Sequence, residues 1–452
     1  MGTRYGKRIV TDGLVLCLDA ADNISAPHND LPVKQGCLMW LDGADDSVFT
    51  YSSGTSVSEW RDKSGNNNHV SNSNGTYQPS RNVTINSKSA VNFYTSSLQA
   101  TNVFSSSATS YTKIAVVYQT SSGAGNVISS NTGHAFWFQS STYVKLHHNG
   151  NFVTSSISLP NNTAGIISGT VQYNSSSSAS GEVFVNGASG GTGTTSNASI
   201  NSTTVQIGSF GGANYFIGYI AEVLVYDRVL SSDELTKVHN YLQNKWNIEV
   251  SDAKWYDRTA NENNASFYNA PVYADTNKGY FELDGVDSYM QGSIDSSTFS
   301  GASSVSCWFK RHSVTSWSGL FSNNVSQTSA VLLTFNGTSN QVGINRSGVS
   351  AVTIGPTLSN YLNKWIFCTL VLAGSTSGSS ILVYVYQDGN LSTTGGTLYW
   401  DLNTSSNYYI GRHYTTATQI HDGYISQVLV HNKALSADEV AQNYNATKGR
   451  YL

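Results

Sequence analysis

The stretch "GLVLCLDAAD", residues 13–22, is followed closely by "GCLMWLDGAD", residues 36–45. Each copy is a short apolar run that ends in an acidic turn, which is the pattern of a buried β-strand followed by a tight turn. Too few residues separate the two copies to form a domain. The doubling therefore predicts two β domains, one of which begins here and is completed far away in the sequence.

A second pair of repeats marks where the two domains end. Residues 218–238, "GYIAEVLVYDRVLSSDELTKV", align without gaps to residues 423–443, "GYISQVLVHNKALSADEVAQN". Each copy predicts a strand and then a helix, and the helix opens with the Ser-x-x-Glu spacing of a capping box at Ser231 and Ser436. Upstream, "VQIGSF" at 205 parallels "YYIGRH" at 408, so the matches run in the same order in both units.

The repeats show that one unit is inserted into the other. The segment 59–70, "EWRDKSGNNNHV", follows the second acidic turn, whereas its counterpart 254–267, "KWYDRTANENNASF", lies beyond the first complete unit. The first strand of the chain is therefore predicted to belong to the last domain. This assigns residues 1–35 and 250–452 to a discontinuous outer domain and residues 36–249 to an inserted domain, an arrangement that exposed loops tolerate.

Composition excludes several classes of function. The 452 residues are only 12% charged and 12% aromatic, which favours β-sheets joined by polar turns. With 24 basic and 28 acidic residues the net charge is −4, so nothing favours nucleic acid as a partner. The sequence has no apolar run long enough for a membrane span and no apolar region typical of a signal peptide behind its N-terminus. The four cysteines lie in strand-like runs without metal-type spacing, so we expect small core residues.

These motifs, together with "FELDGVDSYM" at 281–290, resemble the laminin G-like, concanavalin A-like jelly-roll domains. More narrowly, they are similar to the copies in virion proteins of tailed bacteriophages, whose chains often begin like residues 9–22 and end like residues 442–452. The resemblance implies an all-β fold of two concanavalin A-like jelly-roll β-sandwiches, each with a short C-terminal helix.

The same resemblance implies a non-enzymatic structural protein of a tailed-phage virion, either a capsid decoration or head fibre, or a tail or fibre component. Glycan binding or host adhesion is a plausible added role. The expected partners are other virion proteins, in homo-oligomeric or lattice contacts, and cell-surface glycans, and the expected location is the virion. A secreted carbohydrate-binding adhesin, or a glycoside hydrolase or lyase of this fold, remains the alternative.

Three motifs suggest catalysis or metal binding, but each has a plainer interpretation. Glu282 and Asp284 would share one face of a strand, as in glycosidases of this fold, but Asp287 follows an Asp-Gly turn and leaves that strand. Ser189 in "GASGG" lacks the helix that a nucleophile elbow needs. His147 and His148 are neighbours that a strand would point to opposite faces, so we interpret them as an exposed loop pair. No catalytic residue is therefore predicted.

The acidic turns leave a choice between calcium and structure. Asp19 and Asp22 in one copy, and Asp42 and Asp45 in the other, supply the oxygen ligands that calcium prefers. Their presence in both units argues equally for turns in which aspartate side chains accept local backbone N–H groups. No cofactor is predicted beyond this calcium alternative.

Four side chains are candidates for binding a glycan. Sugar sites combine exposed aromatic rings with planar polar groups, and Arg412, His413 and Tyr414 follow a strand while Trp317 lies in an expected loop. The alternative for these four is an edge of the sandwich or a subunit contact. Four other tryptophans lie in strand-like patterns and are predicted to be core, namely Trp60, Trp255, Trp308 and Trp365.

Overall fold

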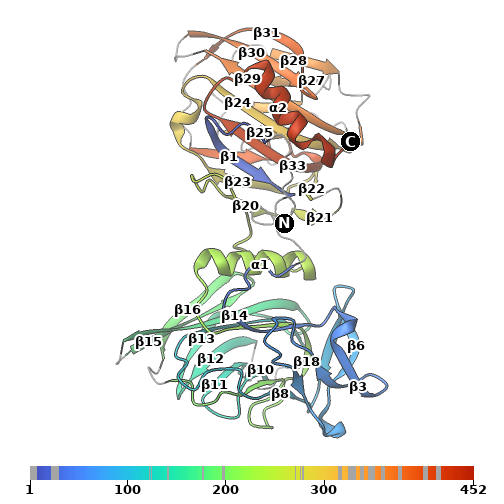
Figure 1. Cartoon of the computed structure of the whole chain (residues 1–452), viewed down its shortest axis with the longest axis vertical. Coiled ribbons are helices and arrows are strands. Elements are labelled where there is room, and N and C mark those ends of the chain that lie inside the picture. The colour runs from blue at the N-terminus through green and yellow to red at the C-terminus, as the bar shows by residue number, and fades with distance from the viewer. Residues whose placement is uncertain are drawn as a thin grey trace. The chain divides into compact units, whose positions relative to one another are not determined.

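The chain forms two compact units in the computed structural model, one made of residues Met1–His28 and Lys254–Leu452 and the other of Asn29–Ala253 (Figure 1). They are called the outer and the inserted unit below, and each is described by itself. The structure describes residues 8–21, 30–121, 123, 125–139, 142–175, 178–195, 199–269, 271–274, 276, 279–313, 318–323, 332–335, 341–344, 352–357, 362–374, 379–400, 406–413 and 419–452.

The inserted unit is a sandwich of antiparallel strands. One layer holds β6 (Ser80–Ile85), β7 (Lys88–Phe93), β18 (Gly218–Tyr226), β9 (Tyr111–Gln119), β14 (Ala164–Ser175), β15 (Ser178–Val185) and β16 (Ala188–Thr195), with β2 (Cys37–Asp42) beside β18. The other holds β3 (Phe49–Ser53), β4 (Ser56–Trp60), β5 (Val70–Ser71), β8 (Leu98–Ala100), β17 (Val205–Ile207), β10 (Gly125–Ser129), β11 (His134–Phe138), β12 (Tyr143–His148) and β13 (Asn151–Ser158).

The outer unit repeats this layout strand by strand. One sheet holds β21 (Val272–Ala274), β22 (Tyr280–Asp284), β33 (Asp422–His431), β24 (Ser303–Arg311), β29 (Trp365–Ala373), β30 (Ser379–Gln387) and β31 (Asn390–Trp400), with β1 (Leu14–Asp19) on β33. The other holds β19 (Lys254–Trp255), β20 (Ala265–Tyr268), β23 (Tyr289–Ser293), β32 (Asn407–Ile410), β25 (Gly319–Ser322), β26 (Leu332–Phe335), β27 (Gln341–Ile344) and β28 (Val352–Thr357). The all-β jelly-roll architecture is therefore confirmed for both units.

Strand β1 lies in the sheet of the outer unit, where the blue N-terminal strand runs among orange and red strands (Figure 1). It pairs antiparallel with β33, with Leu18 opposite Val428. Leu16 and Leu18 are fully buried in the same core cluster as Trp255. The doubled opening motif predicts this pairing, because a buried strand keeps its apolar side chains out of water only beside the sheet that it completes.

One helix closes each unit, α1 (Ser232–Trp246) in the inserted unit and α2 (Ala437–Thr447) in the outer one. Both predicted capping boxes are confirmed: the Ser231 and Ser436 side chains each accept the N–H of the third helical residue, whose glutamate accepts the cap N–H in return. Neither of these helices is long and apolar enough to cross a membrane, and no other helix among the described residues is either.

The predicted core residues are mostly buried. All four cysteines are buried and free, which agrees with their interpretation as small core residues. Trp60, Trp255 and Trp308 are completely buried, whereas Trp365 is only half-buried.

Candidate functional site

The acidic turn of the inserted unit binds lysines. The Asp42 carboxylate lies 2.9 Å from Lys63 Nζ and 2.7 Å from Lys245 Nζ on α1, and Lys63 also contacts Asp45 at 2.8 Å. Burial acts to raise the pKa of Asp42, but the two lysines hold it below its ordinary value. The turn therefore attaches helix α1 to the sheet.

The acidic turn of the outer unit has a comparable partner. Arg450 Nη1 donates to both carboxylate oxygens of Asp19, at 2.6 and 2.8 Å, and Gln427 Nε2 donates to Asp19 at 2.9 Å. Asp22 lies outside the described residues. In the part of the chain that the structure describes, no three His, Cys, Asp or Glu side chains form a group that could hold a metal ion. These contacts favour the structural interpretation of the acidic turns over calcium.

The carboxylates considered for catalysis also build a turn. Glu282 and Asp284 are exposed on one face of β22, but Asp284 Oδ1 accepts the backbone N–H groups of Val286, Asp287 and Ser288. Burial acts to raise the pKa of Asp284, and these bonds lower it below its usual value. Asp284 thus ends a strand.

Ser189 lies in β16 and donates to Glu182 across the β15–β16 hairpin at 2.6 Å. Ser189 lies within a strand, so it is not followed by the helix that a nucleophile elbow needs.

The histidine pair differs from the expectation of an exposed loop. His147 and His148 end strand β12, and His148 is fully buried with Nδ1 3.2 Å from Tyr111 Oη. His147 faces the opposite side of the sheet and accepts the N–H of Gly150 at 2.9 Å. The two rings are therefore divided between the core and the outer face, so they cannot share a metal ion.

The predicted glycan residues are only partly brought together. Trp317 and Tyr414 lie outside the described residues. His413 was expected to be exposed, but it is 1% exposed, with Nδ1 2.5 Å from Gln419 Oε1, and burial lowers its pKa to about 4. It offers no ring face to solvent.

Arg412 instead belongs to an aromatic stack on the outer face of β20, β23 and β32. Its guanidinium carbon lies 4.5 Å from the Tyr289 ring centroid and 5.6 Å from that of Tyr409. The Tyr289 ring stacks on Tyr268 with centroids 4.8 Å apart and an angle of 2° between the planes. Tyrosine and arginine side chains thus cover this face of the outer unit.

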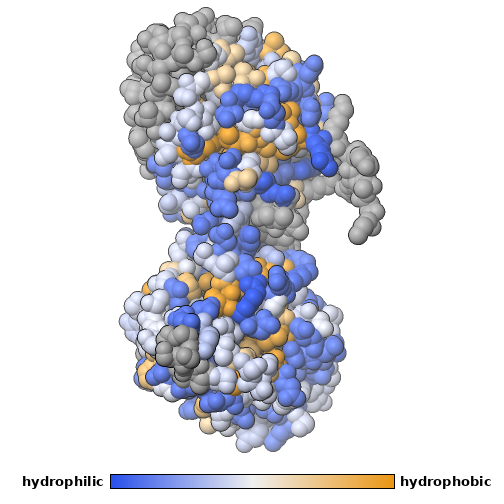
Figure 2. Space-filling view, turned by 60° about the vertical axis from the view of Figure 1, so that its left-hand side comes forward, coloured by the Kyte–Doolittle hydropathy of each residue, from blue (hydrophilic) through white to orange (hydrophobic). Residues whose placement is uncertain are grey.

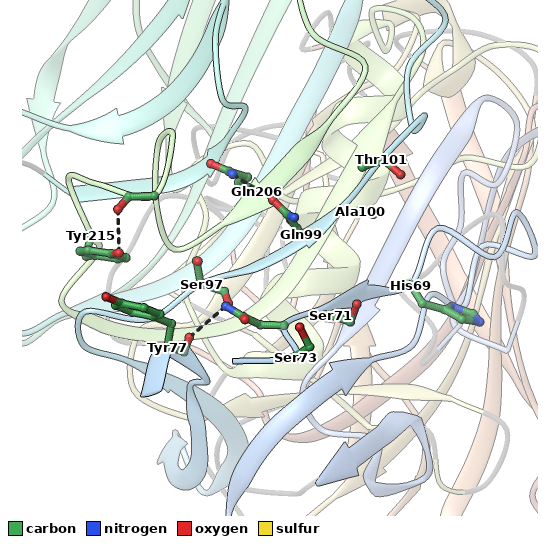
Figure 3. A pocket seen from close by; sticks show the side chains of 12 residues that line it. His69, Ser71, Ser73, Tyr77, Ser97, Gln99, Ala100, Thr101, Gln206 and Tyr215 are labelled. Carbon is green, nitrogen blue, oxygen red and sulfur yellow. Dashed lines mark hydrogen bonds between the residues drawn. The ribbon is translucent and has the colours of Figure 1, made fainter. Parts of the chain in front are cut away.

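The equivalent face of the inserted unit carries a pocket of about 610 Å³ (Figure 3). Its floor is formed by β5, β8 and β17, on which Ser71 pairs with Gln99 and Gln99 with Gln206. In the outer unit the matching register brings Ser266, Gln291 and Tyr409 side by side. A step of two residues along each strand stays on the same face. After this step, Ser73 and Ser97 of the inserted unit correspond to the stacked Tyr268 and Tyr289 of the outer unit. The pocket is open because serines stand where the outer unit has tyrosines.

Two tyrosine rings stand at one side of this pocket, one above the other (Figure 3). The Tyr77 and Tyr215 ring centroids are 6.4 Å apart with 6° between the planes, and Tyr77 is 42% exposed. Tyr215 Oη donates to the Gly212 carbonyl at 2.7 Å, and the Ser97 N–H donates to the Tyr77 carbonyl at 2.9 Å. The first bond orients the Tyr215 ring, and the second holds the backbone of Tyr77 at the edge of the pocket.

Amide groups line the floor of the pocket beside these rings. Gln206 Nε2 donates to Gln99 Oε1 at 3.1 Å, and Gln206 Oε1 accepts the Gly211 N–H at 2.8 Å. Among the described residues, the Gln99 amide is bonded only through its oxygen, so its nitrogen can donate to a ligand. Parallel aromatic rings beside planar amides form the arrangement that sugar recognition needs.

The sequence did not single out these four residues. Tyr77, Gln99, Gln206 and Tyr215 come from four separate segments, and only the sheet register brings them together. The repeat is the one sequence feature that could have indicated the pocket. Aligning "VQIGSF" with "YYIGRH" places Gln206 at the position of Tyr409, close to the candidate Arg412.

The family model described as the concanavalin A-like lectin/glucanases superfamily, a laminin G-like domain, matches residues 92–236 and 284–441. The matched segments cover more than half of the chain, with one in each unit, so the chain belongs to this superfamily. A search of curated proteins finds no match to it.

Three solved structures are similar to this chain at low sequence identity. Domain 4 of AbnA, an extracellular arabinanase from Geobacillus stearothermophilus, solved with arabinotriose, is 17% identical over 42% of this chain and 92% of that chain, with a TM-score of 0.34. The binding domain of botulinum neurotoxin serotype D/C is 11% identical over 91% of this chain and 98% of that chain, with a TM-score of 0.34. The match to the receptor-binding domain of botulinum neurotoxin type G is 16% identical, has a TM-score of 0.31, and covers 42% of this chain and 47% of that one.

Proposed function

We propose that this protein is a non-enzymatic, carbohydrate-binding structural component of a tailed-bacteriophage virion. One observation carries the carbohydrate part: the parallel Tyr77 and Tyr215 rings stand beside the Gln99 and Gln206 amides in an open pocket of about 610 Å³. Aromatic rings contact the C–H faces of a sugar, and amides exchange hydrogen bonds with its hydroxyls.

On the face seen in Figure 2, hydrophilic and hydrophobic residues are interspersed in both units. The choice of a sugar as ligand rests on the residues of the pocket, namely the Tyr77 and Tyr215 rings and the Gln99 and Gln206 amides.

The virion part rests on the sequence. Residues 9–22 and 442–452 resemble the two ends of phage virion proteins, and in the outer unit these ends meet, since Arg450 binds Asp19. The proposed partners are other virion proteins, held through homo-oligomeric or lattice contacts, and the proposed location is the assembled particle. A secreted adhesin with the same pocket would bind glycans without being part of a particle.

A glycan array probed with the labelled full-length chain tests the binding proposal, followed by calorimetry with a selected neutral oligosaccharide. We expect Tyr77→Ala and Tyr215→Ala each to weaken binding by about tenfold or more, because each removes aromatic contact area worth about 1.5–3 kcal/mol when fully buried. The matched control is Tyr94→Ala, since Tyr94 is 66% exposed and does not line the pocket. A chain that binds no glycan, or Tyr77 and Tyr215 variants that bind like the Tyr94 variant, would overturn the proposal.

Two further measurements test the virion location and the non-enzymatic role. Mass spectrometry of purified virions should detect the chain, and its recovery only as a secreted protein would favour the adhesin. Incubation with the bound polysaccharide should release no new reducing ends. Depolymerisation that disappears in Glu282→Gln would show instead that the chain is a glycosidase.

A further inference from the structure

A second pocket lies on the other side of the loop that carries Tyr215. Gly212 and Tyr215 line the pocket described above, whereas Phe210 and Asn214 line another of about 380 Å³. Asn214 and Tyr215 are consecutive, so their Cα atoms are only about 3.8 Å apart. The loop therefore separates two adjoining pockets of the same unit.

The outer face of β10, β11 and β12 forms the wall of the second pocket. Trp137 pairs with Asn126 on one side and with Lys145 on the other, and His147 pairs with Phe152. The intervening residues of these strands point into the core, so this set faces outward. Phe152 is 55% exposed and offers its ring to a ligand.

The ammonium of Lys145 lies against these rings and has no carboxylate partner among the described residues. Lys145 is 8% exposed, and its Nζ lies 4.6 Å from the Phe152 ring centroid and 5.9 Å from that of Trp137. No carboxylate of the described residues pairs with this ammonium, whereas Lys63 and Lys245 of the same unit each bind two acidic side chains. An ammonium that lies beside a pocket and has no carboxylate partner attracts an anionic ligand.

Trp137 supplies the second ring of the pocket wall. Its indole Nε1 is buried, so a ligand contacts the ring and not this N–H. The pocket thus has two aromatic rings in its wall, and the Lys145 ammonium lies close to both of them.

We infer that this second pocket is a subsite for a carboxylate-bearing sugar, such as a uronic acid, and that the two pockets together bind consecutive residues of one acidic oligosaccharide. The sugar ring stacks on Phe152 and Trp137. Its carboxylate accepts from Lys145 Nζ, which is the short, charge-assisted type of hydrogen bond. The neighbouring neutral sugar lies against Tyr77 and Tyr215. This inference rests on the proposed carbohydrate binding and adds the charge of the ligand.

The test compares one glycan in two forms. The probe is an oligosaccharide of alternating glucuronic acid and N-acetylglucosamine, six residues long, and the same oligosaccharide with its carboxyl groups reduced to alcohols. Calorimetry with the full chain should give about tenfold or more weaker binding for the reduced form, because the charge-assisted bond is lost. Lys145→Met keeps the apolar stem and removes the charge, so it should bind both forms with the same weakened affinity. The matched control is Lys88→Met, since Lys88 is exposed at the start of β7.

The outcomes separate this inference from the function on which it rests. A preference for the acidic form that Lys145→Met abolishes and Lys88→Met retains would support it. Equal binding of both forms by the unaltered chain, or a preference that survives in Lys145→Met, would overturn it. If binding of the neutral form is still lost in Tyr77→Ala, the proposed function stands although the acidic subsite does not. A chain that binds neither form and no other glycan would remove both.

Discussion

The carboxylate of Asp257 accepts the backbone N–H of Cys17 at 2.8 Å, although 240 residues separate the two. The inserted unit has the same contact, because Asp62 accepts the N–H of Trp40 at 2.9 Å. In both units one buried aspartate joins the first strand to the loop that follows the Trp-x-Asp motif. The inserted unit makes this contact over a short separation, whereas the outer unit makes it across the whole insertion.

Removing this carboxylate should destabilise one unit and spare the other. In Asp257→Ala the buried N–H of Cys17 and the partly buried N–H groups of Thr259 and Asn263 lose their acceptor. An unpaired N–H costs about 1–3 kcal/mol when it is buried and less when water can reach it. We expect the outer unit to lose about 3 kcal/mol of its free energy of unfolding. Asp257→Asn keeps one oxygen and should lose less. Calorimetry should show a single lowered transition, and Asp62→Ala should lower the other transition; a common shift of both would contradict the expectation.

The N-terminal strand should stabilise the outer unit although it precedes the insertion. Leu16 is fully buried in the outer core, so Leu16→Ala should reduce the stability of that unit by about 2–5 kcal/mol through lost burial and a residual cavity. Deleting residues 1–34 should cost at least as much. Hydrogen exchange of the full chain measures this unit by unit. Loss of protection in β9 and β14 instead of β24 and β33 would show that the strand serves the inserted unit.

The sequence predicts that the N-terminal strand completes the sheet of the outer unit, but it does not predict the pockets, and the reason is physical. A buried strand leaves a strong local pattern, so the doubled run at residues 13–22 and 36–45 sufficed to suggest which sheet Leu16 completes. The pocket depends on cross-strand register, which sets Gln99 beside Gln206 and which no local pattern encodes. The position of Arg412 just after a strand can be read from the sequence. Its contact with Tyr289 and the stacking of Tyr268 on Tyr289 depend on strand pairing and cannot. His413 is likewise buried and bonded to Gln419, a partner that no local pattern indicates.

The core of the inserted unit contains a lysine, Lys113, that no carboxylate of the described residues contacts, and this should make the stability of the unit depend on pH. Lys113 is fully buried, with Nζ 2.6 Å from His134 Nδ1 and 3.3 Å from the Ile128 carbonyl oxygen. Burial lowers the pKa of Lys113 well below 10.5. It also lowers the pKa of His134, and Lys113 adds to that effect. The unfolded chain therefore binds more protons than the folded unit, and stability rises with pH.

Lys113→Met should reduce this dependence. Between the folded pKa of Lys113 and 10.5, one extra proton on the unfolded chain gives a slope of about 1.4 kcal/mol per pH unit. Urea unfolding at pH 7, 8 and 9 should show a smaller slope in Lys113→Met, while Lys88→Met, at an exposed position, should keep the original one. Below the unfolded histidine pKa of 6.5, His134 should still destabilise the unit in both variants. Equal slopes in all three chains would mean that Lys113 is charged in the folded unit.

The difference between the two units predicts how to close the first pocket. Ser73 is exposed and lies where the outer unit places Tyr268, whose ring stacks on Tyr289 at 4.8 Å. Ser73→Tyr should fill part of the pocket with a ring and weaken sugar binding by about tenfold or more, because the ligand loses the aromatic and amide contacts that it would make there. Since the position is exposed, the free energy of unfolding should change by no more than about 0.5 kcal/mol. Ser73→Ala is the control and should bind sugar normally. If Ser73→Tyr binds as tightly as the control while remaining folded, the sugar does not occupy the face formed by β5, β8 and β17.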